Sequence, residues 1–413
     1  MSSDGDRPRV SVVIPTYNRC EMLRTTLEHL TRQQLPPGEF EVIVADDGSS
    51  DATKEVVESF AGRLRVKYHF QEDLGFRAGA ARNAGARSAA APLLVFLDTG
   101  PLFGTDFLLR HLAAHADETE RRAVIGYAYG YKPEKDMSWI TGVVAQVGPE
   151  ETVARHAHDP EFQDVRHPYL ADIVSGLDHL PWRLFFTINC SVRTDDFWAV
   201  GGFDEEFHGW GAEDTELAFR LSRHGVRFTV AEDAWVVDLP HDREQFDLWE
   251  QLARNMLHFL AKHREPAIEI GLALAIRHLF WSYEEDYRAL LAWQEQARDT
   301  DVAAELTAAV RRVPAGAKIA ILGSGGEIPA AVPPAILLDF DAELVARAAA
   351  AGGHVGHHTM GLRTPLADQS VDTVIVTSRF AGLWERWQDE LLTEARRIGR
   401  EVVVPAGFGA EHD

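Results

Sequence analysis

Carboxylate side chains stand at three separated places in this 413-residue chain where they could do chemistry. Asp47 and Asp98 each follow a short apolar run, and Glu213 and Asp214 open a segment with helical periodicity. A carboxylate can accept a hydrogen bond from an imide N–H such as that of uracil, bind a divalent cation, or take a proton from a hydroxyl. Each also has a structural interpretation, because residues 46–49 form a plausible turn and helix cap, and acids are common where helices begin.

The elements expected around these carboxylates bring two of them to one edge of a sheet. The first hundred residues alternate between strand and helix patterns, with strands expected at 10–14, 41–45, 64–70 and 93–97, and helices at 21–33, 51–60 and 77–88. This alternation predicts a parallel sheet of right-handed βαβ units, whose ligands bind beyond the carboxyl ends of the strands. Residues 15–17, Asp47 and Asp98 all fall at those ends.

The rest of the chain divides into further regions. Residues 126–181 have poor periodicity and many polar side chains, which predicts a long loop that lines a ligand pocket. We expect three domains: 1–244 as a ligand-binding α/β domain, 245–312 as a helical extension, and 313–413 as a small α/β domain beginning at a Pro/Gly linker.

The composition excludes several classes of partner. Lys and Arg number 41 against 64 Asp and Glu, so the formal net charge is −23, which would repel nucleic acids and anionic membranes. Two cysteines cannot form a disulfide framework and indicate a reducing compartment. We expect no secretory signal, no membrane span and a cytoplasmic protein.

Four segments in order resemble the nucleotide-sugar glycosyltransferases of family 2, which have the GT-A fold. They are VSVVIPTYNR at 10–19, VADDGSSD at 44–51, GFRAGAARNAG at 75–85 and FLD at 96–98. The resemblance implies that the uridine pocket is formed by Pro15, Thr16, Tyr17 and Asp47. It implies that Arg77 and Arg82 form the cationic flank of the donor, and that Arg19 and Asp98 also belong to the donor-binding set.

A fifth segment, WGAED at 210–214, resembles the W-G-G-E-D segment of galactosyltransferase-like enzymes. The resemblance implies that Asp214 is the general base of an inverting transfer, with Glu213 as a catalytic neighbour that contacts the acceptor sugar, and that Trp210 is an aromatic platform. It further implies transfer of a hexose, with glucose favoured, from a UDP-sugar to a hydroxyl of a small polyol or aminocyclitol, as in antibiotic biosynthesis.

The metal site departs from the family pattern. The family carries Asp-x-Asp, whereas this chain reads Asp98-Thr99-Gly100 and lacks the second carboxylate. His241 matches a histidine that often completes the site in the family, although a structural loop histidine is an equal alternative. We therefore expect Mg²⁺ or Mn²⁺ to bind weakly, through Asp98, His241 and the phosphates of the substrate.

The last hundred residues resemble the core of S-adenosylmethionine-dependent methyltransferases, with a Gly-rich turn at 323–326 and an acid, Asp339, after the second strand. The region is too short for the whole fold, which favours a non-catalytic, structural or homodimer-forming module of Rossmann-like α/β type. Two rival functions remain: a methyltransferase, alone or as part of a bifunctional enzyme, and a catalytically inactive sugar-binding scaffold. The intact Asp214 and Trp210 argue against the scaffold.

Overall fold

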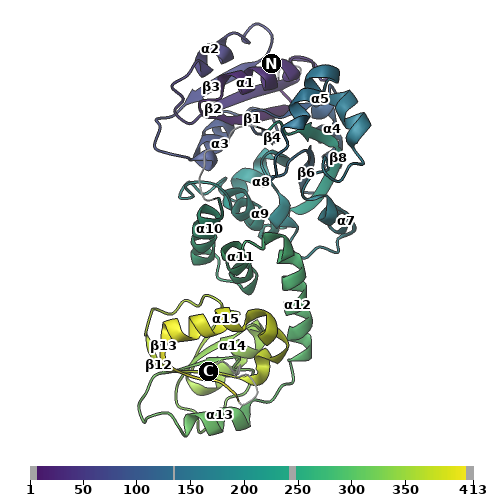
Figure 1. Cartoon of the computed structure of the whole chain (residues 1–413). Helices are drawn as coiled ribbons and strands as arrows, with labels where there is room; N and C mark the ends of the chain where they lie inside the picture. The colour runs from purple at the N-terminus through teal and green to yellow at the C-terminus, as the bar shows by residue number, and fades with distance from the viewer. Residues whose placement is uncertain (1–6, 134, 241–247, 406–413) are drawn as a thin grey trace. The chain divides into compact units, whose positions relative to one another are not determined.

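The computed structural model describes residues 7–133, 135–240 and 248–405. The chain forms two compact units, residues 1–251 and residues 252–413, and each is described by itself (Figure 1). Of the helical extension expected at 245–312, residues 252–312 fall in the same unit as the C-terminal strands.

The first unit is built on one sheet with the strand order β3-β2-β1-β4-β7-β6-β8-β5. Its strands are β1 (Val10–Thr16), β2 (Phe40–Asp46), β3 (Val66–Phe70), β4 (Leu93–Leu97), β5 (Leu102–Phe103), β6 (Arg122–Tyr129), β7 (Asn189–Arg193) and β8 (Arg227–Val237). Its helices are α1 (Cys20–Leu30), α2 (Thr53–Glu58), α3 (Ala78–Arg87), α4 (Phe107–Ala114), α5 (Trp139–Val147), α6 (Pro149–His156), α7 (His167–Ser175), the 3₁₀ turn η2 (Pro181–Leu184), α8 (Thr194–Ala199) and α9 (Glu213–Arg223).

The four N-terminal strands, β1 to β4, are parallel to one another, as the sequence predicts. β1, β2 and β4 are nearly continuous runs of buried Val, Ile, Leu and Phe, because helices cover both faces of a parallel sheet. β7 then joins the sheet antiparallel to both β4 and β6, so the second half of the sheet is mixed. The carboxyl ends of β1, β2 and β4 therefore lie along one rim.

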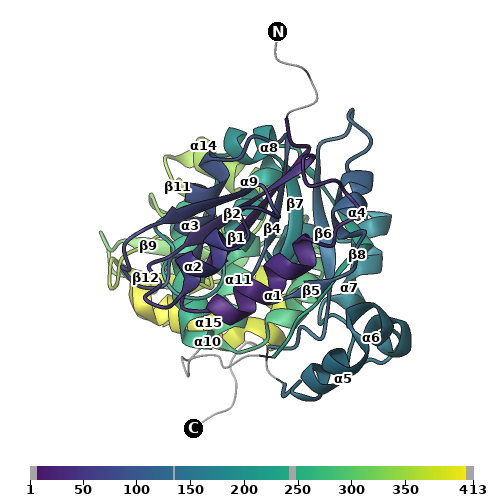
Figure 2. The same cartoon turned by 90° about the horizontal axis from the view of Figure 1, so that it is seen from above.

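The prediction of a long loop over residues 126–181 is wrong. The segment contains the end of β6 and the helices α5, α6 and α7, and α5 and α6 lie side by side at one edge of the unit (Figure 2). These helices have eight or nine residues each, too few for a clear helical period, and Gly148 and Gly176 end two of them with positive φ angles. Buried Asp164 pairs with buried Arg166 at 2.7 Å, and the two anchor the segment to β6, because Asp164 accepts from the Ala128 N–H and Arg166 donates to the Gly126 carbonyl.

The second unit holds a parallel sheet with the strand order β11-β10-β9-β12-β13. Its strands are β9 (Ile319–Leu322), β10 (Ile336–Asp339), β11 (Val355–His358), β12 (Val371–Val376) and β13 (Gly399–Val403). Its helices are α10 (Leu248–Lys262), which begins at the boundary, α11 (Pro266–Ile276), η3 (Phe280–Ser282), α12 (Tyr283–Gln296), α13 (Ala303–Val310), α14 (Ala342–Gly352), η4 (Ser378–Phe380) and α15 (Ala381–Ile398).

The helices of residues 252–312 pack directly on this second sheet domain. On α12, Asp286 pairs with Arg386 of α15 at 2.7 Å, and the indole N–H of Trp293 donates to the carbonyl of Arg379. These contacts explain why the helices and strands form one compact unit. No helix among the described residues is long and apolar enough to cross a membrane.

Candidate active site

The carboxyl ends of β1 and β2 hold the first group of expected donor-binding residues. The backbone N–H of Asp47 donates to the carbonyl of Thr16, which joins the two strand ends. The Asp47 carboxylate accepts hydrogen bonds from the backbone N–H of Arg77 at 2.8 Å and from the side chain of Gln71. The Thr16 hydroxyl is buried without a partner among the described residues, so it has unused hydrogen-bonding capacity at this rim.

The two neighbouring aspartates of this rim have different environments. Asp46 makes the turn, because one of its oxygens accepts from the N–H groups of Gly48 and Ser49 and the other from the hydroxyl of Tyr68. Gly48 has a φ of +100°, and a Cβ there would lie 2.5 Å from the backbone nitrogen of Asp73. The structural interpretation of the Asp46–Asp47 turn thus applies to Asp46, and Asp47 is not used as a helix cap.

Three other donor candidates lie around this group. Tyr17 is 42% exposed, and its hydroxyl donates to Asp73 at 2.9 Å. The Arg77 guanidinium lies 3.5 Å from the Asp47 carboxylate, and its buried Nε has no partner among the described residues. Arg19 precedes α1 and is half-buried. Arg77 therefore carries a positive charge close to Asp47.

Arg82 has a different environment from the one expected of a cationic flank. Its side chain is buried on α3 and donates to Asp98 at 2.9 Å and to Glu213 at 3.1 Å, while its guanidinium carbon lies 5.6 Å from the centre of the Phe203 ring. It thus connects the end of β4 to the start of α9, and its partner Glu213 lies 131 positions further along the chain. No sequence pattern signalled this connection, because each residue belongs to a different local motif.

Asp214 lies at the first turn of α9, beside Glu213. Its oxygens accept from the backbone N–H groups of Thr215 at 2.7 Å and Thr187 at 3.3 Å. Desolvation and the neighbouring Glu213 carboxylate raise the pKa of Asp214 to about 7, although Arg82 and the backbone donors act in the opposite direction. A carboxyl with such a pKa can exchange a proton near neutral pH.

The loop before α9 is held in a tight conformation. Gly209, Gly211 and Ala212 all have positive φ angles, and Ala212 adopts this left-handed conformation without the freedom of glycine. The half-buried Trp210 donates its backbone N–H to Gln251 at 2.8 Å, and the N–H of Gly209 donates to the carbonyl of Phe76. The loop that carries Trp210 is therefore fixed against the loop that precedes α3.

The residues around Asp98, where the metal was expected, offer little support for strong binding. Asp98 has a 39% exposed side chain, so it could contribute a ligand oxygen, but its neighbour Arg82 adds a positive charge that opposes a cation. Gly100 is buried with a φ of +117°, and a Cβ there would collide with Met22 on α1. A side chain at position 100 would therefore point toward α1 and not toward the expected metal site. The second expected ligand, His241, lies outside the described residues.

Comparison with known proteins defines the class of this enzyme. The family model described as "Glycosyl transferase family 2" matches residues 11–158, and the one described as "N-terminal domain of galactosyltransferase" matches residues 177–242. The chain belongs to glycosyltransferase family 2, and its first unit is the GT-A fold that the sequence predicts.

Two curated relatives resemble the chain over nearly its full length. It is 42% identical over 413 residues to the validoxylamine A glucosyltransferase of Streptomyces hygroscopicus subsp. limoneus, covering 97% of this chain and 91% of that one. It is 41% identical over 410 residues to the enzyme of the same name from S. hygroscopicus subsp. jinggangensis, covering 97% of each. The prediction of a glycosyltransferase is confirmed.

Solved structures resemble the chain more distantly. Staphylococcus aureus TarS 1–349 in complex with UDP-GlcNAc is 19% identical, with a TM-score of 0.47, covering 74% of this chain and 82% of that one. The mannosyltransferase PcManGT from Pyrobaculum calidifontis in complex with GDP-Man and Mn²⁺ is 22% identical, with a TM-score of 0.46, covering 74% and 80%.

The environment of Gly100 generates a prediction. Gly100→Asp should lower the free energy of unfolding by about 2 kcal/mol or more, because it places a side chain on a backbone with positive φ and buries a carboxylate, besides displacing the end of the Met22 side chain. It should not increase the dependence of the rate on Mg²⁺ or Mn²⁺. Thermal unfolding and rates with and without EDTA measure the two effects.

The matched control for this change is Gly38→Asp, since Gly38 has open space around it and no positive φ. A Gly100→Asp protein as stable as this control, or one whose rate becomes strictly metal-dependent, would contradict the assigned orientation of position 100.

Proposed function

We propose that this chain transfers glucose from UDP-glucose to a hydroxyl of validoxylamine A, with inversion at the anomeric carbon. The transfer of glucose and the choice of acceptor are supported by the 42% and 41% identity to two enzymes named validoxylamine A glucosyltransferase, which extends over 97% of the chain. The observation that carries the mechanism is Asp214, a carboxyl with a raised pKa that accepts from the Thr187 N–H just before β7, and the start of β7 pairs with the end of β4.

The proposed donor pocket uses the rim of β1 and β2. Asp47 accepts the imide N–H of the uracil, and the Arg77 N–H, which already binds one carboxylate oxygen, holds the group in position. The unpartnered Thr16 hydroxyl and the exposed Tyr17 ring supply further contacts to the nucleoside, next to Pro15. Arg19 and Arg77 supply positive charge for the diphosphate.

The proposed transfer is a single in-line displacement. Asp214 takes the proton from the acceptor hydroxyl while that oxygen forms a bond to the anomeric carbon. The bond from this carbon to the phosphate oxygen breaks, and UDP leaves with the electron pair. Glu213 and Trp210 position the acceptor, and Arg82 keeps Glu213 and Asp98 in place.

A divalent cation has a limited place in this scheme. Mg²⁺ or Mn²⁺ would be held by Asp98, with His241 as the further proposed ligand and the rest of the shell from the donor phosphates and water. When bound, the cation would neutralise charge on the departing diphosphate. The single described carboxylate and the adjacent Arg82 favour weak binding that needs the donor.

We further propose that the sheet domain of the second unit, which resembles methyltransferases, is non-catalytic and has a structural or homodimer-forming role. Asp339, at the end of β10, is fully buried and accepts hydrogen bonds from the Gly325 N–H and from Arg379. Arg379 is also fully buried, and its chain lies against Gly323 and Gly325. An acid committed to an internal ion pair is not available to bind a cofactor ribose.

The closed environment of Asp339 predicts that the protein does not bind S-adenosylmethionine. Calorimetric titration of the full chain should show no heat of binding at micromolar to millimolar ligand, whereas titration with UDP should show binding. Micromolar affinity for S-adenosylmethionine would contradict the structural role and restore the methyltransferase alternative.

Asp214→Asn should reduce glucosyl transfer by about a hundredfold or more, because an amide keeps the shape of the side chain but cannot take a proton. UDP-glucose affinity should stay within a few fold. The test incubates enzyme, UDP-glucose and validoxylamine A and measures the glucosylated product by mass. Asp195→Asn is the control, since Asp195 is an exposed acid in the first turn of another helix, α8.

The raised pKa of Asp214 sets the direction of the pH dependence. A general base must be ionised, so the rate should be full above pH 7 and fall about tenfold per unit below it. Glu213→Gln should move the midpoint to lower pH, because the Glu213 charge raises the pKa of Asp214. Rates from pH 5 to 9 check both effects. A midpoint unchanged in Glu213→Gln would exclude Asp214 as the group that titrates.

A further inference from the structure

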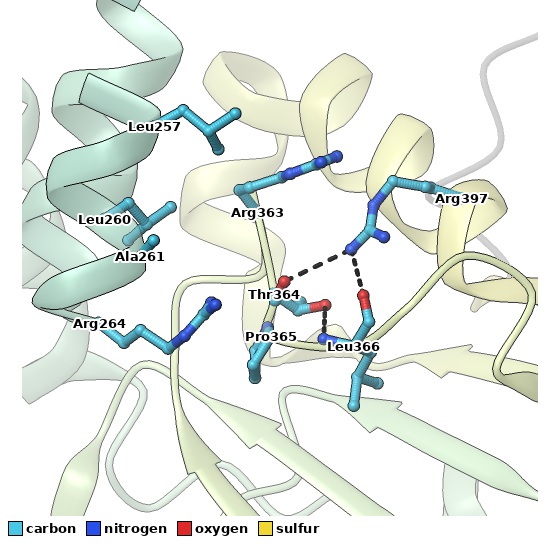
Figure 3. Close-up of a pocket in the computed structure, with 9 residues that line it drawn as sticks. All are labelled: Leu257, Leu260, Ala261, Arg264, Arg363, Thr364, Pro365, Leu366 and Arg397. Carbon is cyan, nitrogen blue, oxygen red and sulfur yellow. Dashed lines mark hydrogen bonds between the residues drawn. The ribbon is translucent and has the colours of Figure 1, made fainter. Parts of the chain in front are cut away.

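The second unit contains a small cavity that the proposed transfer does not use. It has a volume of about 200 Å³ and lies between the end of α10 and the loop that joins β11 to β12 (Figure 3). Leu257, Leu260, Leu366 and Pro365 supply apolar surface, with Ala261 and Thr364 beside them. Three arginines, Arg264, Arg363 and Arg397, complete the lining, and no carboxylate is among the lining residues.

The loop that forms one wall is held by two buried carboxylates. Glu269 on α11 accepts from the Thr359 hydroxyl and from the backbone N–H groups of Met360, Leu362 and Arg363. Glu394 on α15 accepts from both the N–H and the hydroxyl of Thr364. Because nearly every donor of this stretch is bound, the cavity wall is fixed before any ligand arrives.

The three arginines differ in how far their charge is already used. Arg397 donates to Glu394, to Asp368 and to two loop carbonyls, so it is part of the wall. Arg363 lies 3.8 Å from Glu394, whose oxygens already accept closer hydrogen bonds from Arg397. Arg264 is exposed and forms no ion pair with any described residue. Two guanidinium groups thus retain donors for a ligand.

We propose that this cavity binds a small phosphate monoester whose organic part is apolar. Two guanidinium groups match the charge and the acceptor oxygens of a phosphate dianion better than those of a single carboxylate. The leucine and proline side chains suit an apolar substituent, and the volume limits the ligand to a small molecule. The chain as a whole has a formal net charge of −23, so a cavity lined by three arginines and no carboxylate is a locally positive site that would attract an anion.

The test uses phenyl phosphate as the probe and the full-length protein, with binding measured by calorimetry. Arg363→Gln and Arg264→Gln should each weaken binding by about tenfold or more, because each removes a charge-assisted hydrogen bond. Arg312→Gln is the matched control, an exposed arginine of the same unit outside the cavity, and should change the affinity less than twofold. Any phenyl phosphate that binds to the first unit should bind equally to the unmodified protein and to these variants. A difference in affinity between them therefore reports on the cavity.

Inorganic phosphate supplies the second comparison. It should bind several-fold more weakly than phenyl phosphate, since it cannot use the apolar wall. Phenyl phosphate binding that is undetectable at millimolar concentration, or that both arginine variants retain, would overturn the proposal. Equal affinity for the two probes would overturn the assignment of an apolar substituent. Unchanged thermal unfolding of the variants separates lost binding from lost structure.

Discussion

The active site depends on one buried cation. Arg82 is enclosed between Asp98, at the end of a strand, and Glu213, at the start of a helix. Burial disfavours the guanidinium charge, but the two carboxylates outweigh this effect and the pKa of Arg82 is raised. A charge buried in this way is stable only with its partners, so the strand end and the helix start have to meet in one geometry.

The same cation influences the chemistry on both of its sides. Its positive charge lowers the pKa of Asp214, opposing the effect of Glu213, so the proton affinity of the proposed base is a balance between two neighbours. Toward the donor, it occupies one oxygen of Asp98 and repels a second cation there. One side chain thus links the strength of the base to the weakness of the metal site.

The sequence predicted local features well and long-range pairings poorly. The strands ending at Thr16, Asp46 and Leu97 were predictable because buried parallel strands are short continuous apolar runs bounded by turn residues. The connection through Arg82 was not, because its members lie far apart in the chain and each has a sufficient local explanation. The helices of residues 126–181 were missed since their length gives no clear period, and Met22 behind Gly100 could not be anticipated from the sequence around residue 100.

The hydrogen bonds of Glu269 determine where this protein can be divided. The Pro/Gly stretch at 313–316 looks like a natural place to separate helices from strands, yet α11 reaches across it through this one carboxylate. A fragment that starts after residue 316 would leave three backbone N–H groups of the 359–363 loop without their acceptor, each a loss of about 1–3 kcal/mol. A fragment meant to fold on its own should therefore keep residues 252–413 together, with the helices before the Pro/Gly stretch included.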